Sequence, residues 1–228
     1  MTKMELLDNP IWHALTTNQK ASGFGNDHAR RYRPDVAPFV AIERATPEAE
    51  AGLLEIVDPG EKVGVLGVAP EFGKSWKVER EANILQMVFH GSISAEGDSD
   101  IQLLTEADIP AMVELTGLVY PAYFRPGTAR LGAYFGIYRD GQLCAMAGER
   151  MGFTGHQEVS AVCTHPDHRG RGHARRLINH LVGVIVGRGD TAFLHGDDDN
   201  EAAIALYRNL DFKLRRSIPF WVFQKGDR

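Results

Sequence analysis

The chain has 228 residues, a formal net charge of −5 at pH 7 and 43% hydrophobic residues. This length and composition suit a soluble protein with one or two compact cores, and the acidic balance argues against a general binder of nucleic acid or anionic membranes. The two cysteines, Cys144 and Cys163, indicate neither a disulfide scaffold nor a cysteine metal site, so we expect a reducing, cytoplasmic setting. No apolar run is long enough to span a membrane, and the residues up to Asn9 lack the apolar core of a signal peptide.

The first part of the chain is expected to form a small α/β unit. Apolar spacing and turn residues predict two helices, over 9–17 and 47–57, and three strands, over 39–43, 63–69 and 84–89. Residues 91–100 are small and polar, which is typical of a junction between domains. We therefore divide the chain into an N-terminal α/β domain over 1–97 and a second domain over 98–228.

The second part is expected to alternate strands and helices around a hairpin. Asp140 and Gly141 form a turn signal between two strand patterns. The expected strands cover 101–104, 134–139, 142–151, 158–164, 191–195 and 212–224, and the expected helices cover 106–118, with Thr105 as its cap, and the stretches that begin at Ala174 and Asn200. A proline-rich turn or short helix is expected over 120–128. This succession predicts an α/β fold with a mixed sheet.

A glycine-rich loop connects the strand over 158–164 to the helix that follows it. The loop runs Arg169-Gly170-Arg171-Gly172-His173-Ala174. A helix N-terminus offers unpaired N–H groups and a positive dipole end to an anion, and glycine lets a ligand approach the backbone. The loop lacks the Gly-Lys-Ser/Thr ending of a P-loop, and its glycine spacing does not fit the dinucleotide-binding fingerprint. It predicts a cradle for a phosphate group.

Two motifs in this part resemble the GNAT superfamily (GCN5-related) of acyl-CoA-dependent N-acyltransferases. The pattern of Arg169, Gly172 and Ala174 resembles the family's Gln/Arg-x-x-Gly-x-Gly/Ala loop, which binds the pyrophosphate of coenzyme A. The stretch from Asn200 to Phe212 resembles its Asn…Ala…Tyr…Leu-Gly-Phe element, with Asp211 in the place of glycine. Asp also tolerates the left-handed conformation that a helix end requires, so the change is acceptable.

The resemblance implies the GNAT fold, a central twisted mixed β-sheet flanked by helices, for residues 98–228. For residues 1–97 it suggests a degenerate GNAT-like half, as some members carry, with an unrelated small α/β cap as the alternative. It also implies acetyl-CoA as cosubstrate, with no metal. The partner would be a small-molecule amine or a peptide acceptor, not nucleic acid or a membrane, and a homodimer is left open.

The same resemblance assigns the residues that would bind the coenzyme. Val162 and Thr164 would offer main-chain groups to the pantetheine arm, as an added strand would. Asn200 would cap its helix and also meet this arm or the substrate. The expected set is Val162, Cys163, Thr164, Arg169, Gly170, Arg171, Gly172, His173, Ala174, Asn200, Ala203 and Tyr207, although the side chain of Cys163 is expected to fill the core.

The expected reaction is attack of a primary amine on an acyl thioester, which needs an acceptor for the amine proton and a donor for the sulfur. Glu158 is the candidate base, because its spacing to Arg169 resembles that in the histone-acetyltransferase branch; a strand-edge carboxylate facing water is the alternative, and Glu149 is the reserve candidate. Tyr207 is the candidate acid, because a phenol stays protonated at neutral pH. Packing of its helix onto the sheet is the alternative role.

Other clusters receive simpler interpretations. The histidines near the loop do not indicate a metal, because Arg169 and Arg171 would repel a cation. The acidic run 197–199 suits a helix start and could also hold a cationic substrate. The aromatic residues expected to line the acceptor side are Tyr120, Tyr123, Phe124, Tyr134 and Phe135.

The sequence leads to the hypothesis of an N-acetyltransferase that works by direct transfer. A second hypothesis is a catalytically weak acyl-CoA-binding regulatory or interaction module, in which the N-terminal half occupies the acceptor cleft. Release of free thiol from acetyl-CoA with a panel of amines distinguishes the two.

Overall fold

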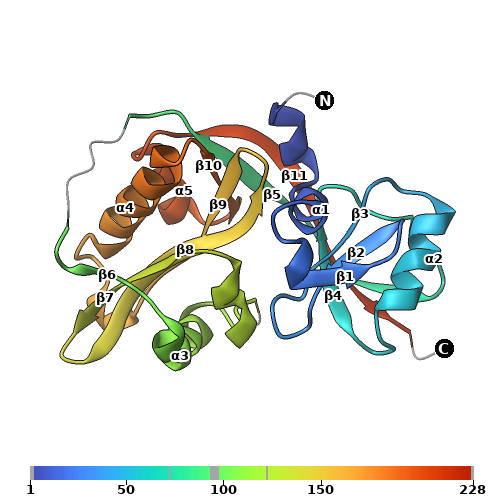
Figure 1. The fold of residues 1–228 in the computed structure, drawn as a ribbon, viewed down its shortest axis with the longest axis horizontal. Helices are drawn as coiled ribbons and strands as arrows, with labels where there is room; N and C mark the ends of the chain where they lie inside the picture. The colour runs from blue at the N-terminus through green and yellow to red at the C-terminus, as the bar shows by residue number, and fades with distance from the viewer. Residues whose placement is uncertain (1–2, 72, 93–97, 122, 227–228) are drawn as a thin grey trace.

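The computed structural model describes residues 3–71, 73–92, 98–121 and 123–226. Its main feature is an eight-stranded mixed sheet with the strand order β4-β11-β5-β10-β9-β8-β7-β6, beside a three-stranded sheet β1-β2-β3 (Figure 1). The strands are β1 (Gly23–Gly25), β2 (Ala29–Tyr32), β3 (Val40–Ile42), β4 (Lys62–Leu66), β5 (Trp76–Phe89), β6 (Ile101–Leu103), β7 (Tyr134–Arg139), β8 (Gln142–Phe153), β9 (His156–Thr164), β10 (Thr191–Asp197) and β11 (Phe212–Lys225). The prediction of a mixed α/β fold is confirmed.

Helices cover both faces of the large sheet. They are α1 (Pro10–Thr16), α2 (Pro47–Ile56), α3 (Ile109–Val119), α4 (His173–Gly187) and α5 (Glu201–Arg208). Side chains alternate along β8, so Met146 packs in the cluster beneath α3 while Ala145 and Ala147 pack in the cluster beneath α4. Helix α3 therefore lies on one face and α4 on the other, as Figure 1 also shows. None of the helices in the described residues is long and apolar enough to cross a membrane.

Local sequence signals place most elements of the second part correctly. The turn at Asp140 and Gly141 joins β7 to β8, and both residues have positive φ. Helix α4 buries the apolar stripe that its spacing predicts, including Leu177, Leu181 and Ile185. Asp211 has φ +60°, so the left-handed conformation expected where the family has glycine is confirmed.

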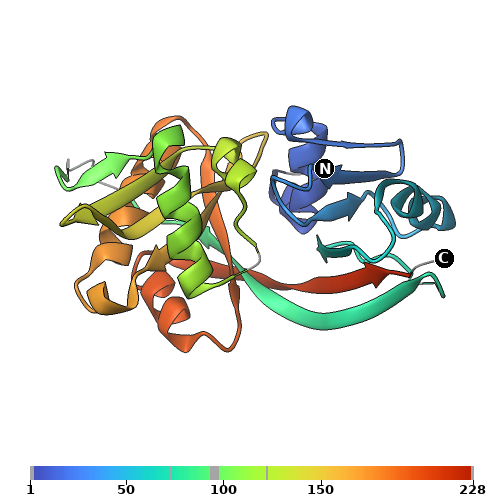
Figure 2. The same cartoon turned by 90° about the horizontal axis from the view of Figure 1, so that it is seen from below.

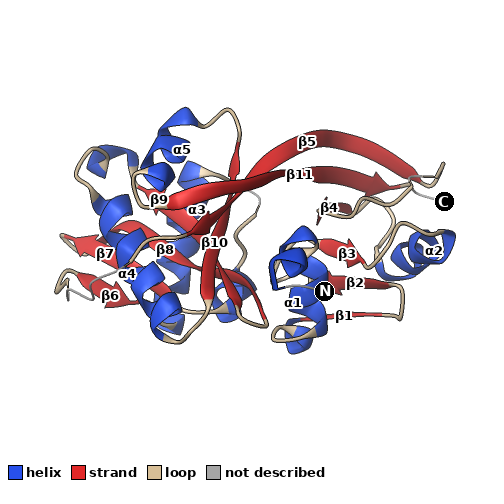
Figure 3. Cartoon of the chain, turned by 90° about the horizontal axis from the view of Figure 1, so that it is seen from above, coloured by secondary structure: helices blue, strands red, loops and turns tan. Residues whose placement is uncertain are grey.

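Strand β5 joins the two parts of the chain. The sequence predicts a strand only over 84–89, but β5 begins at Trp76 because its exposed, charged first half pairs with β11. It lies between β11 and β10, and it runs beside β11 from one part of the molecule to the other (Figures 2 and 3). The expected boundary at residue 97 thus follows a strand of the large sheet, and the division into two domains stays a prediction.

One hydrophobic core also contains residues from both sides of that boundary. Leu7 and Ile11 of the first part pack in the same buried cluster as Met151, Phe153 and Phe193 of the second. Each of these five side chains is at most 1% exposed. Each Å² of apolar surface removed from water contributes about 25 cal/mol to the free energy of folding. Because the two parts bury these side chains against each other, each part stabilises the other.

A chain that begins at Asp98 is therefore expected not to fold on its own. It would lack β5, leaving β10 and β11 without the strand between them, and it would expose Phe153 and Phe193 to water. We expect circular dichroism to show no cooperative thermal transition for residues 98–228, with the full chain as control. A cooperative transition in the fragment would show instead that the second part is an independent domain.

Candidate acyl-transfer site

The large sheet splits between β9 and β10. The two parallel strands are paired only from His156–Thr191 to Glu158–Phe193. Beyond that point β10 continues beside β5, and β9 continues beside β8 as far as Thr164. The facing edges of β9 and β10 then carry main-chain N–H and C=O groups with no strand between them. These groups are available to form hydrogen bonds with a ligand or with water. The split is suited to an extended ligand that adds to a strand edge.

A cavity of about 710 Å³ lies at this split. Its walls include all twelve residues that the sequence assigns to coenzyme binding, together with Val119, His168, Arg175, Ala202 and Leu206. Cys163 is also 3% exposed and belongs to the core cluster under α3, as expected for its side chain. The structure therefore brings the predicted set together in one place.

The glycine loop forms one end of this cavity. Gly172 precedes the first residue of α4 with φ +76°, no side chain caps the helix, and Gly170 has φ +74°. A Cβ at either glycine would meet nothing within 4 Å, so the space in front of the loop is open. Arg169 and Arg171 are exposed beside it. The uncapped N–H groups, the helix dipole and the two arginines make this end attractive to an anion.

Helix α5 forms the other wall. The Asn200 side-chain oxygen accepts a hydrogen bond from the Ala203 N–H at 3.1 Å, so its role as helix cap is confirmed. Tyr207 packs against Phe212 at a ring-centroid distance of 6.2 Å and also lines the cavity. Burial raises the pKa of the Tyr207 hydroxyl to about 12, so it holds its proton at neutral pH.

Glu158 lies where the sheet splits, and it is fully buried. Its Oε1 accepts hydrogen bonds from Arg150 Nη2 at 2.6 Å and His195 Nδ1 at 2.7 Å, while Oε2 accepts from Arg150 Nε at 2.8 Å and the Met151 N–H at 3.2 Å. Burial alone would raise the pKa of Glu158, but Arg150 and His195 outweigh it and lower the pKa to about 2. The alternative of a strand-edge carboxylate facing water is wrong.

The orientation of His195 follows from its second neighbour, Gln86. Arg215 Nη1 donates to the Gln86 oxygen at 2.8 Å, and an arginine can only donate, so the amide orientation is fixed. The Gln86 nitrogen then donates to the Leu7 carbonyl at 2.8 Å and to His195 Nε2 at 3.0 Å. In this arrangement His195 Nε2 accepts a hydrogen bond from Gln86, and Nδ1–H donates one to Glu158 Oε1.

Glu149, the reserve base, occupies a different environment. Its carboxylate binds Arg188 Nη2 at 2.7 Å and accepts a hydrogen bond from the Ala133 N–H at 3.0 Å. It is 3% exposed, so the expectation of an exposed strand residue is wrong. Glu149 does not line the cavity at the sheet split, and it does not line a second, smaller cavity next to Arg150 and His195.

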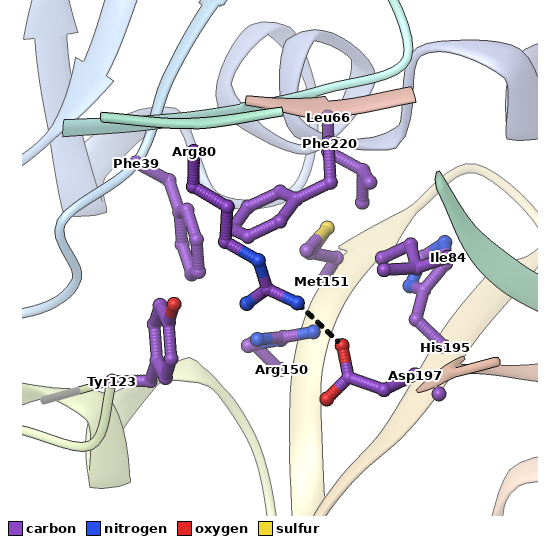
Figure 4. Close-up of a pocket in the computed structure, with 11 residues that line it drawn as sticks. Phe39, Leu66, Arg80, Ile84, Tyr123, Arg150, Met151, His195, Asp197 and Phe220 are labelled. Atoms are coloured by element: carbon purple, nitrogen blue, oxygen red, sulfur yellow. Dashed lines mark hydrogen bonds and ion pairs between the residues drawn. The ribbon is translucent and has the colours of Figure 1, made fainter. Parts of the chain in front are cut away.

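A second, smaller cavity of about 130 Å³ has Gly196 in its lining, whereas Tyr207 lines the larger cavity. Figure 4 shows the smaller cavity. A Cβ built at Gly196 would lie 3.7 Å from Tyr207 Cε2. The lining residues are Phe39, Leu66, Arg80, Ile84, Tyr123, Arg150, Met151, His195, Gly196, Asp197 and Phe220. Both parts of the chain supply walls, so the first part borders this space without filling it.

Of the five aromatic residues expected on the acceptor side, Tyr123 alone lines this cavity. Phe135 packs on His180 with ring centroids 4.5 Å apart, and Tyr120, Phe124 and Tyr134 belong to the cluster under α3. Phe39, just before β3, and Phe220, in β11, also pack against Tyr123, and no local pattern in the sequence indicates this because both lie far from Tyr123 in the chain.

The described residues contain no group of three or more His, Cys, Asp or Glu side chains arranged to hold a metal ion. His165 and His168 lie with ring centroids 5.8 Å apart. Asp197, from the acidic run, pairs with Arg80 Nη2 at 3.0 Å.

The sequence is similar to those of known acetyltransferases. The family model described as FR47-like protein matches residues 134–222. The chain is 34% identical over 124 residues to the N-alpha-acetyltransferase RimI of Mycobacterium tuberculosis, covering 50% of this chain and 77% of that protein. It is 35% identical over 69 residues to an acetyltransferase of Yersinia pestis, covering 29% of this chain and 49% of that protein.

Solved structures extend the likeness to the whole chain. A putative acetyltransferase from the GNAT family of Novosphingobium aromaticivorans has a TM-score of 0.89 and 35% identity, covering 96% of this chain and 98% of that one. A GCN5-related N-acetyltransferase from Kribbella flavida has a TM-score of 0.61 and 15% identity, covering 97% and 94%, which shows the fold alone.

Gly172→Glu is expected to weaken binding of coenzyme A by at least about tenfold, because it puts a negative charge where the loop would meet pyrophosphate. Gly172→Ala is the control, since it shares the backbone strain of the positive φ but adds no charge. Calorimetric titration with coenzyme A measures the affinity, and circular dichroism checks the fold. Unchanged affinity in a folded Gly172→Glu variant would show that the glycine loop does not bind the pyrophosphate of coenzyme A.

Proposed function

Because the chain belongs to the GNAT family of acetyltransferases and is therefore an acyltransferase, we propose that it transfers an acetyl group from acetyl-CoA to a primary amine by direct attack. The observation that carries the proposal is the sheet split between β9 and β10, which leads from the anion cradle of α4 to Tyr207. GNAT acetyltransferases use acetyl-CoA as their cosubstrate.

The residues of the larger cavity fit this cosubstrate. The uncapped start of α4 and the open space before Gly170 and Gly172 suit a pyrophosphate. Both ring nitrogens of His173 are buried without a hydrogen-bond partner in the part of the chain that the structure describes, so they could be satisfied by a phosphate oxygen or a bound water. Val162 and Thr164 would offer main-chain groups to the pantetheine arm along the free edge of β9.

Acetyl-CoA would supply the acetyl group as a thioester, whose carbonyl carbon forms a bond to the amine nitrogen as the bond to sulfur breaks. We assign Tyr207 as the donor of a proton to the departing sulfur, because its pKa of about 12 keeps the hydroxyl protonated. The acceptor would approach from the smaller cavity, on the far side of Gly196. The amine would lose its proton to solvent, and Tyr207 would regain one from solvent.

The geometry favours Glu158 as a positioning residue for this reaction. Both of its oxygens are occupied, and a carboxylate with a pKa of about 2 has little tendency to take a proton from an ammonium group. Its negative charge would instead hold Arg150 and His195 against the acceptor cavity. The assignment of Glu158 as the base remains a prediction from the family resemblance.

Tyr207→Phe is expected to lower kcat by about a hundredfold while leaving coenzyme A affinity nearly unchanged, since it removes only the hydroxyl that donates the proton. Tyr138→Phe is the matched control, because its hydroxyl binds Asp108 at 2.6 Å away from both cavities. Thiol release from acetyl-CoA measures kcat, and calorimetry measures affinity. Wild-type kcat in Tyr207→Phe would show that the tyrosine only packs the helix.

A further inference from the structure

We propose that the acceptor is a free amino acid with an apolar side chain, whose carboxylate is bound by Arg80 and Arg150 in the smaller cavity. This inference rests on the proposed acetyl transfer and adds the class of acceptor. Among the described residues, the lining of this cavity includes two guanidinium groups and one carboxylate, Asp197, beside apolar and aromatic side chains (Figure 4).

The two arginines have donor capacity directed at the cavity. Arg150 uses Nε and Nη2 on Glu158, and no described residue accepts a hydrogen bond from its Nη1. Arg80 gives Nη2 to Asp197 at 3.0 Å, and its guanidinium and that of Arg150 both line the smaller cavity (Figure 4). Guanidinium groups keep their charge and present planar donors that match a carboxylate. A carboxylate bound in this cavity would be attracted by both positive charges.

Asp197 supplies the opposite charge at the adjacent position. An amino acid carries its ammonium and carboxylate on the same carbon atom, so it needs a cationic and an anionic group side by side. The contact between Arg80 and Asp197 provides this pair. Asp197 directly follows Gly196 on β10, and successive side chains of a strand point to opposite faces. An ammonium bound by Asp197 would therefore lie on the face of β10 opposite Tyr207, from which the acceptor would approach.

The side chains that line the cavity indicate what kind of side chain the acceptor amino acid carries. Phe39 and Tyr123 are stacked with ring centroids 6.0 Å apart, and Phe220 meets Tyr123 edge-on at 6.4 Å. A volume of about 130 Å³ is below the roughly 300–1,000 Å³ of sites for drug-sized ligands, which suits a small apolar side chain. A peptide N-terminus would bring an ammonium but no adjacent carboxylate, so the guanidinium N–H groups that Arg150 and Arg80 do not use on Glu158 and Asp197 would gain no charged acceptor.

Matched acceptors test the inference in the full chain. We expect kcat/KM for L-alanine, L-valine or L-leucine to exceed that for the corresponding amino-acid amide by at least about tenfold, the effect of losing one hydrogen bond between charged groups. A tripeptide that begins with the same residue should resemble the amide. Amides or tripeptides that react as well as the free amino acids would overturn the proposal.

Substitution of Arg80 tests whether the smaller cavity causes the preference for free amino acids over amides. Arg80→Gln should lower kcat/KM for the free amino acid by about 10- to 100-fold, and this fall should be at least about tenfold larger than the fall for the amide, which has no carboxylate to lose a partner. Arg44→Gln is the control, because it removes the same charge from an exposed position that lines neither cavity. An equal fall for both acceptors in Arg80→Gln would contradict carboxylate recognition.

Calorimetry provides a readout that does not depend on turnover. The protein saturated with coenzyme A should bind the preferred free amino acid, and Arg80→Gln should bind it at least about tenfold more weakly. Failure of all three free amino acids to bind would overturn the inference. If the chain binds coenzyme A and acetylates only amides or peptides, acetyl transfer stands and the inference fails. If it neither binds coenzyme A nor releases thiol with any amine, the proposed function itself fails.

Discussion

The buried carboxylate of Glu158 is the interaction on which the site depends. A charge removed from water is tolerated only when it is paired and hydrogen-bonded, and Glu158 meets this condition with Arg150 from β8, His195 from β10 and the Met151 N–H. These partners come from the strands on either side of β9, at the point where the sheet splits. The charge cluster therefore fixes the strands beside the opening through which the two substrates would meet.

Polar contacts extend this cluster into the first part of the chain. Gln86 links His195 to the Leu7 carbonyl, and the Gln19 side chain donates to the carbonyl of Arg150. The Arg150 guanidinium also lies over the ring of Phe39, 5.3 Å from its centroid. Each contact joins residues distant in sequence and holds the first part against the site, so that part acts as a wall of the smaller cavity and as a partner in the shared core.

The features predicted correctly from sequence are those that local chemistry determines. The glycine loop before α4, the Asn200 cap and the left-handed Asp211 each follow from a few neighbouring residues. The pairing of Glu158 with Arg150 has no local signal beyond two charged residues within an otherwise apolar strand, Glu149 and Arg150. The length of β5 is also not predictable from local sequence. Its charged first half shows no alternation of apolar and polar residues, and it forms a strand because it pairs with β11.

The ionisation of Glu158 in the folded chain can be measured directly. A carboxyl-carbon NMR titration of the full chain, with the signal assigned by its loss in Glu158→Gln, reports the charge on this side chain. Because its pKa is lowered in the folded chain, the stability that the cluster adds is present above the ordinary pKa of 4.5 and is lost as the pH falls toward about 2. The Glu158 signal is expected to stay that of a carboxylate from neutral pH to below 4.5, changing only toward pH 2 or when the chain unfolds in acid. A titration midpoint at or above 4.5 in the folded protein would show that Arg150 and His195 do not stabilise the buried carboxylate.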